Sequence, residues 1–232
     1  MSIVDPHSPR LVEVAQLLQA VFADPNTVLG LDRLREFLAA NAAPGERTFY
    51  VHAAIGRDDR VLGATVFSYV PRSNCGFSEY IVSRPDGRGQ GIGRRLFDAR
   101  KRQLDEAASA AGYAGCNGLF IEADNPARTP AALLEAERQT AIDAVERLRL
   151  VAHLGFLRVD VAYVQPPLGP GKQAVDYLDL LFAPWRADAQ SEIPSIWIVE
   201  TLAPIWAAWS PGTRPPALPQ HSRLQLLPLV PS

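Results

Sequence analysis

The segment Gly87–Arg95, GRGQGIGRR, constrains this chain more than any other stretch of its sequence. It holds four glycines and three arginines, and it lies between a strand-like apolar run and an amphipathic helical pattern. Glycine has no side chain, so a glycine-rich turn leaves its backbone amides uncovered. The first turn of a helix offers N–H groups without intrahelical partners, together with the positive end of the helix dipole. This combination predicts a phosphate-binding turn at a helix N-terminus.

Three common phosphate-binding motifs do not fit the segment. A Walker loop needs a lysine directly after its last glycine, and none stands there. The dinucleotide fingerprint GxGxxG fails because Ile92 or Arg94 occupies its last glycine position. A kinase glycine loop joins two strands, whereas a helical pattern follows here. The stretch that remains is Arg88–Gly93, RGQGIG.

Composition places the chain among ordinary globular proteins. Its 232 residues are 47% hydrophobic and carry a net charge of -2, which gives no support for nucleic-acid binding. We expect no membrane span and no signal peptide, because no apolar run has the required length or position. Cys75 and Cys116 are too few for a disulfide framework and indicate reduced thiols in a cytoplasmic protein. The histidines show no metal-ligand spacing, so no metal is expected.

Hydrophobic periodicity predicts an alternation of helices and strands. Helices are expected at 11–22, 31–40, 92–111, 129–154 and 196–209. Strands are expected at 2–4, 48–56, 61–71, 75–83, 118–124, 156–165 and 174–184. The prolines after residue 209 predict no regular structure there. We therefore divide the chain into one domain, residues 1–184, and a C-terminal extension, residues 185–232, with a Trp-rich helix and a Pro-rich tail.

The stretch RGQGIG resembles the acyl-CoA-binding signature of the GNAT acyltransferase superfamily, in which Arg or Gln is followed after two residues by Gly-x-Gly or Gly-x-Ala. Arg88, Gly91 and Gly93 occupy its three defined positions. The order of the expected elements agrees with this family over most of residues 1–184. The resemblance implies one α/β domain with a mixed, mostly antiparallel central sheet flanked by helices. It also implies direct transfer of an acetyl group from acetyl-CoA to a primary amine within a ternary complex.

The resemblance also suggests where the cosubstrate binds. Backbone amides at the end of the strand before the motif would face the thioester, and the glycine turn would hold the pyrophosphate. The expected cofactor-binding residues are Val82, Ser83, Arg88, Gly89, Gln90, Gly91, Ile92, Gly93 and Arg94. Among the glycines, Gly87 is expected to form the turn out of the strand.

Two carboxylates are candidates for the general base. Strand alternation places Glu79, Ile81 and Ser83 on one face. The histone acetyltransferases of this superfamily have their base two residues earlier, where this chain has Phe77. Glu79 is the first candidate, with an ion pair to an arginine as its alternative role. Glu122 on the next strand is the second.

The general acid departs from the family pattern. Many relatives have a tyrosine four residues before the glycine of a Gly-Phe pair, and Val151 stands at that position here. Tyr163 on the following expected strand could replace it, and His153 lies nearby in sequence. A packed tyrosine with one satisfied hydroxyl is the structural alternative for Tyr163.

Several functional alternatives stay open at this stage. The missing tyrosine is compatible with a CoA-binding regulatory or interaction module that has no catalysis. A different acyl donor or a hydroxyl acceptor would use the same cofactor motif. A small-molecule amine is expected as acceptor rather than a protein. The Trp-rich helix could cover the acceptor site or form a homodimer contact, and the 129–154 helix could shape substrate choice.

Overall fold

The computed structural model describes residues 1–43, 45–87, 89–140, 143–186, 191–218 and 222–229. Its strands are β1 (Ser2–Ile3), β2 (Thr48–Ile55), β3 (Val61–Val70), β4 (Cys75–Ser83), β5 (Gly118–Asp124), β6 (Leu157–Val159), β7 (Leu178–Pro184), β8 (Glu192–Pro194) and β9 (Arg223–Leu227). Its α-helices are α1 (Pro9–Val21), α2 (Leu31–Ala40), α3 (Ile92–Ala110), α4 (Ala131–Thr140), α5 (Ala144–His153) and α6 (Ser195–Trp209). Two short 3-10 helices are η1 (Pro25–Thr27) and η2 (Pro85–Gly87).

The described strands form one nine-stranded sheet in the order β1-β2-β3-β4-β5-β7-β6-β9-β8. Neighbouring strands in this part of the chain are antiparallel, except that β4 and β5 are parallel. The expected α/β class with a mixed, mostly antiparallel sheet flanked by helices is therefore confirmed. Among the described residues, every helix is too short or too polar to cross a membrane.

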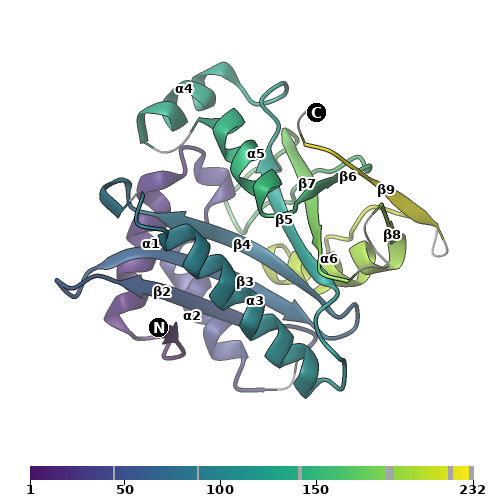
Figure 1. Ribbon diagram of the computed structural model, residues 1–232, viewed down its shortest axis with the longest axis horizontal. Coiled ribbons are helices and arrows are strands. Elements are labelled where there is room, and N and C mark those ends of the chain that lie inside the picture. Colours follow the sequence, from purple (N-terminus) through teal and green to yellow (C-terminus); the bar gives the residue numbers. More distant parts are fainter. Residues whose placement is uncertain (44, 88, 141–142, 187–190, 219–221, 230–232) are drawn as a thin grey trace.

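Helices cover the sheet on both sides (Figure 1). We call one side the α6 face, because α1, α2 and α6 pack there against side chains of β2, β3 and β4 in one core cluster. The other side is the α3 face, where residues of α3 and α5 pack in a second cluster with residues of β3, β5 and β7. Any group that passes between two strands of this sheet therefore connects two separately packed helical layers.

The sequence predicted the strands and helix around the glycine turn well. The expected hairpin is present as β2 and β3, and β4 spans the same residues as predicted. Helix α3 ends near Gly112, whose φ of +88° is a left-handed conformation that glycine adopts without strain. A two-residue alternation predicts strands, and a helical period predicts helices. Both patterns are more reliable over long elements such as β3, β4 and α3.

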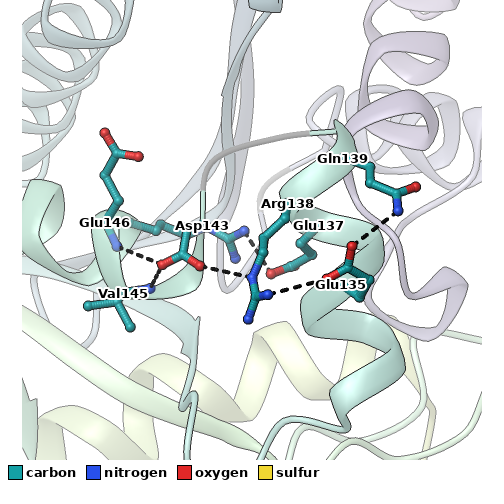
Figure 2. A network of polar contacts seen from close by, with 8 residues as sticks. Glu135, Glu137, Arg138, Gln139, Asp143, Val145 and Glu146 are labelled. Carbon is teal, nitrogen blue, oxygen red and sulfur yellow. Dashed lines mark hydrogen bonds and ion pairs between the residues drawn. The ribbon is translucent and has the colours of Figure 1, made fainter.

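The single helix expected at 129–154 is wrong, because the structure has two helices, α4 and α5. Asp143 begins the second one, since its carboxylate accepts hydrogen bonds from the N–H groups of Val145 (2.9 Å) and Glu146 (3.4 Å). The same carboxylate lies 3.3 Å from Arg138 on α4 (Figure 2). An aspartate in this pattern is an N-cap, and the periodicity of the flanking apolar residues concealed it.

The C-terminal end of the chain also differs from the prediction. Strand β9 forms despite the surrounding prolines, and it pairs with β6 through Arg158↔Leu227 and Val159↔Leu226. The strand expected at 156–165 is correspondingly short, because only its first part, β6, enters the sheet. A proline inside a strand cannot donate a hydrogen bond to the neighbouring strand. The five residues of β9 include no proline, so the prolines outside it do not prevent its pairing.

Helix α6 packs into the core of the sheet. Trp206 and Trp209 are 5% and 2% exposed, and the ring of Trp209 lies 5.6 Å from that of Phe77 on β4. These tryptophans therefore belong to an intramolecular interface. The division of the chain at residue 184 stays a prediction, but α6 shares its core with β4.

We expect Trp209→Ala to lower the free energy of unfolding by about 3–5 kcal/mol, because it removes a buried aromatic ring and leaves a cavity against β4. Equilibrium denaturation in urea measures the change. Ala207→Ser, on an exposed position of the same helix, is the control and should leave stability nearly unchanged. Equal stability of the Trp209→Ala variant and the parent protein would show that α6 is dispensable for the domain.

Candidate active site

The parallel strands β4 and β5 separate partway along their length. Their pairing covers Gly76↔Leu119, Phe77↔Phe120 and Ser78↔Ile121, and it ends there. Beyond this point β4 continues beside β3 and β5 continues beside β7. The backbone edges that face each other past Ser78 and Ile121 are thus not joined by the sheet ladder. We call this place the β4–β5 divergence.

A β-bulge accompanies the divergence. Val66 on β3 pairs with Tyr80, whereas the next residue, Phe67, pairs with Ser78, so Glu79 is the extra residue of β4. A bulge bends its strand and increases the local twist. Strand β4 therefore turns away from β5 at Glu79.

The bulge overturns the face assignment made from strand alternation. Glu79, Ile81 and Ser83 were expected to share a face, but the extra residue shifts the alternation by one. Tyr80 and Val82 lie in the core cluster of the α6 face, while Ile81 packs with the cluster of the α3 face. Nothing in the local sequence marks a bulge at this position, so the alternation could not reveal the shift.

Glu79 occupies a buried polar network on the α6 face. One carboxylate oxygen accepts a hydrogen bond from Ser68 Oγ (2.8 Å) and lies 3.2 Å from an Arg47 nitrogen. The guanidinium of Arg47 also stacks over the rings of Phe37 and Phe49. The second oxygen, Oε2, is buried and has no hydrogen-bond partner. Burial raises the pKa of Glu79, and Arg47 opposes this shift.

Glu122 lies on the adjacent strand β5, and its carboxylate accepts a hydrogen bond from the hydroxyl of Tyr163. Burial raises the pKa of Glu122 to about 8, and the nearby charge of Glu79 adds to the rise. Tyr163 is not on a strand, because β6 ends before it. Its ring packs 5.9 Å from that of Trp206 on α6. The structure thus brings two of the sequence candidates, Glu122 and Tyr163, into direct contact.

The glycine turn leads into α3 in an open conformation. Gly89 and Gly91 have φ values of +76° and +69°, and Gly91 is the N-cap of the helix. A Cβ added to Gly89, Gly91 or Gly93 would meet nothing within 4 Å. Gly87 has no positive φ, and a Cβ there would lie 2.8 Å from Ile92 Cδ1. Gly87 ends η2, the short turn that leads out of β4, and its N–H donates to the Arg84 carbonyl (3.0 Å). It therefore stands in the turn where the sequence placed it.

The N-terminus of α3 lacks a side-chain cap, as do those of α2 and α6, whereas Ser8 and Asp143 cap α1 and α5. The N–H groups of its first turn are available to an anion, and the open glycines let the anion approach. Gly93 has an ordinary helical conformation and free space around it. Packing and backbone conformation therefore do not require glycine at position 93. A ligand that carries a phosphate and lies close to the backbone would require it.

The remaining expected cofactor contacts are placed as follows. Arg88 lies outside the described residues. Arg94 is exposed and forms an ion pair with Asp98 one turn later (3.1 Å). The Arg84 N–H donates to β3, and ladder alternation then directs the Val82 N–H to β3 and the Ser83 N–H toward the β4–β5 divergence.

Two arginines near the bulge were not singled out from the sequence. Arg47, which precedes β2, is the ion-pair partner of Glu79. Arg100 on α3 is 1% exposed and donates to Ser78. A signal for Arg100 was present, because it stands four residues from both Leu96 and Leu104 in the apolar stripe of the helix. No comparable signal marked Arg47.

The other candidates are placed away from this network. Val151, at the position of the family tyrosine, packs in the cluster of the α3 face. His153 is exposed and bonds to the carbonyl of Arg149 (2.7 Å). Cys75 and Cys116 are free, buried thiols whose pKa values burial raises. In the described part of the chain, His, Cys, Asp and Glu side chains form no group of three that could hold a metal ion.

Comparison with known proteins places these features in a family. A sequence model described as "Acetyltransferase (GNAT) family" matches residues 11–133, a little more than half of the chain. A candidate acetyltransferase of Acinetobacter baylyi is similar in structure, with a TM-score of 0.51, 14% identity, and coverage of 81% of this chain and 92% of that one. The ribosomal-protein-S18-alanine N-acetyltransferase of Escherichia coli has a TM-score of 0.47 and 15% identity, with 79% and 91% of the two chains covered. No curated protein sequence matches.

We expect Gly93→Ala to separate stability from ligand binding. Alanine at this helical position should raise the free energy of unfolding by about 0.5–1 kcal/mol. The added methyl should also obstruct a bound pyrophosphate and weaken coenzyme A binding about tenfold or more. Thermal denaturation and isothermal titration measure the two effects.

Gly30→Ala is the matched control for this variant. Gly30 is also at a helix N-terminus, with a φ of -74° and nothing within 4 Å of an added Cβ. Its coenzyme A affinity should equal that of the parent protein. Equal affinity in the Gly93→Ala variant would argue against the glycine turn as the phosphate site.

Proposed function

Because this chain belongs to the GNAT acetyltransferase family, we propose that it transfers an acetyl group from acetyl-CoA to a primary amine of a small acceptor molecule. The transfer is direct, within a ternary complex of enzyme, acetyl-CoA and amine. Acetyl-CoA is a cosubstrate held by the glycine turn, with Arg88 and the first-turn N–H groups of α3 as contacts for its pyrophosphate.

One observation carries this proposal: the β4–β5 divergence has an uncapped helix N-terminus toward one face and two carboxylates on the other, the buried Glu79 and the half-buried Glu122. Helix α3 lies on the α3 face, whereas Glu79 and Glu122 belong to the α6 face. A thioester that enters from the α3 face and an amine that enters from the α6 face meet between the strands. Opposite approach suits a direct attack, since neither substrate has to leave before the other binds.

Glu122 is the better general base of the two carboxylates. An ammonium ion first releases one proton to solvent, and the attacking amine must then lose a second proton as the amide forms. A base with a pKa near the working pH is favoured for this second proton. The pKa of Glu122 is about 8, and its contact is a neutral hydroxyl. Glu79 has Arg47 as an ionic partner, which favours its charged form and weakens it as a base. Glu79, the base expected from the sequence, then balances the charge of Arg47.

Tyr163 holds the carboxylate of Glu122 in position. Its hydroxyl donates to Glu122, and its ring is fixed against Trp206. Burial raises the pKa of Tyr163 well above its usual value, so the hydroxyl stays protonated as a hydrogen-bond donor. During transfer the amine nitrogen forms a bond to the carbonyl carbon, its proton passes to Glu122, and the bond from carbon to sulfur breaks.

The first test is binding followed by turnover. We expect isothermal titration to show binding of acetyl-CoA, and Arg88→Ala to weaken it about tenfold or more through loss of a charge-assisted hydrogen bond. Thiol release should then require an amine from a panel of small amines and fail with the matching alcohols. Binding without thiol release from any amine would favour the non-catalytic CoA-binding module. No binding would refute both functions.

A second test concerns the base. We expect kcat at saturating acetyl-CoA to rise with pH through about 8, because Glu122 must be ionised to accept a proton. Glu122→Gln should lower kcat by about 10²- to 10⁴-fold and remove this pH limb. Glu106→Gln, on an exposed position of α3, should retain both. A limb that survives in Glu122→Gln and vanishes in Glu79→Gln would return the role to Glu79.

A further inference from the structure

Arg100 is the most unusual buried charge in this protein. Its side chain is 1% exposed, on a helix that packs directly against the sheet. One terminal nitrogen donates to the hydroxyls of Ser78 and Thr65 (3.4 Å for Thr65). Its Nε is buried without a hydrogen-bond partner. Buried arginines are normally paired with an anion, because an uncompensated buried charge is costly.

No carboxylate of the described residues forms an ion pair with Arg100. Glu79, across the bulge, is the charged group that raises its pKa, while burial lowers that pKa to about 9. Glu79, however, has its ion pair with Arg47. Two cations thus surround one carboxylate at this place, since Glu122, with its pKa of about 8, is mostly protonated at pH 7. The guanidinium of Arg100 lies over the ring of Phe97, 5.2 Å from its centroid, but it has no anionic partner among the described residues.

The other groups that face α3 from the sheet do not supply the missing anion. His52 on β2 has a pKa lowered to about 4 by burial, so it is neutral. Thr65 on β3 and Ser78 on β4 offer neutral hydroxyls. On α5, the side chains that pack against this face are Leu148 and Val151.

Arg100 also stands at a particular place relative to the β4–β5 divergence. Its partner Ser78 is the last β4 residue that pairs with β5. From Ser83, near the glycine turn, to Ser78 there are five strand residues, or about 16 Å. This length is similar to that of an extended pantetheine arm. In a coenzyme A whose pyrophosphate binds at α3, the pantetheine arm would then pass the Ser83 N–H, where the sequence led us to expect the thioester. On this reckoning the sulfur would lie near Ser78.

We propose that the guanidinium of Arg100 stabilises the coenzyme A thiolate that leaves when the thioester bond breaks. This inference rests on the proposed function. The amine nitrogen bonds to the acyl carbon, its proton goes to Glu122, and sulfur departs with the electron pair of the broken bond. Arg100 provides a fixed positive charge for that electron pair, and no proton transfer to sulfur is required at this step. The charge takes the place of a tyrosine hydroxyl, which Val151 cannot supply.

The test compares coenzyme A with desulfo-coenzyme A, which lacks only the thiol. If Arg100 stabilises the thiolate, coenzyme A should gain affinity relative to the desulfo compound as the pH rises. The ratio of their two dissociation constants should change by about tenfold between pH 7 and pH 8.5. The pyrophosphate contacts affect both ligands equally. The carboxylates of Glu79 and Glu122 would repel a thiolate, so a preference for coenzyme A that grows with pH reports a cation at the sulfur. A ratio that does not change with pH would overturn the inference, even before any variant is made.

Arg100→Gln keeps a hydrogen-bonding side chain but removes the charge. It should abolish the pH dependence of the ratio and lower kcat by about 10²-fold. Arg100→Lys should restore part of both effects. Arg102→Gln, on an exposed position of the same helix, should behave as the parent protein. Circular dichroism verifies folding; should Arg100→Gln not fold, the comparison of the two ligands in the parent protein and in Arg100→Lys still decides.

The outcomes separate this inference from the proposed function. Failure of both ligands to bind would refute coenzyme A binding itself. Binding of both with a constant ratio, or a pH-dependent ratio retained in Arg100→Gln, would leave the acetyltransferase proposal intact and overturn the role of Arg100. Another outcome is that succinyl-CoA binds more tightly than acetyl-CoA, with the difference lost only in Arg100→Gln. This result would assign the charge of Arg100 to recognition of an acidic acyl chain and would also overturn its role at the thiolate.

Discussion

The structure depends on one constraint, the separation of its two parallel strands. Strands β4 and β5 pair over three residues and then part, because Glu79 is an extra residue in β4 that bends the strand. The separation of β4 and β5 leaves unpaired backbone edges inside a sheet that is otherwise continuous from β1 to β8. It also connects two helical layers that are packed separately. The carboxylate of Glu79 and the guanidinium of Arg100 come close to each other at this single irregularity.

Charge around the bulge follows from the same geometry. Arg47 reaches Glu79 from the α6 face, and Arg100 reaches Ser78 from the α3 face, one residue away along β4. Charges this deeply buried are far less screened than surface ion pairs. Removal of one member would therefore change the pKa values of the others. Arg47, Glu79 and Arg100 therefore form one coupled set of charges.

Much of this arrangement was predictable where local signals are strong. The strand before the glycines, the turn and helix α3 were predicted because alternation, glycine clustering and helical periodicity each act over neighbouring residues. The break between α4 and α5 was missed because the capping role of Asp143 competes with a continuous apolar pattern. Strand β9 was missed because its formation depends on β6, a partner far away in the sequence.

The sequence by itself determined the family, the mixed α/β fold and the position of the glycine turn before α3, since these depend on residue types at fixed local spacing. Only the tertiary structure decided the chemistry of the site. It placed Glu79 opposite Arg47, joined Glu122 to Tyr163, and buried Arg100 beneath the divergence. Each of these contacts joins residues that are 22 or more positions apart. Their proximity arises from strand register and a bulge, which no local pattern of residues encodes.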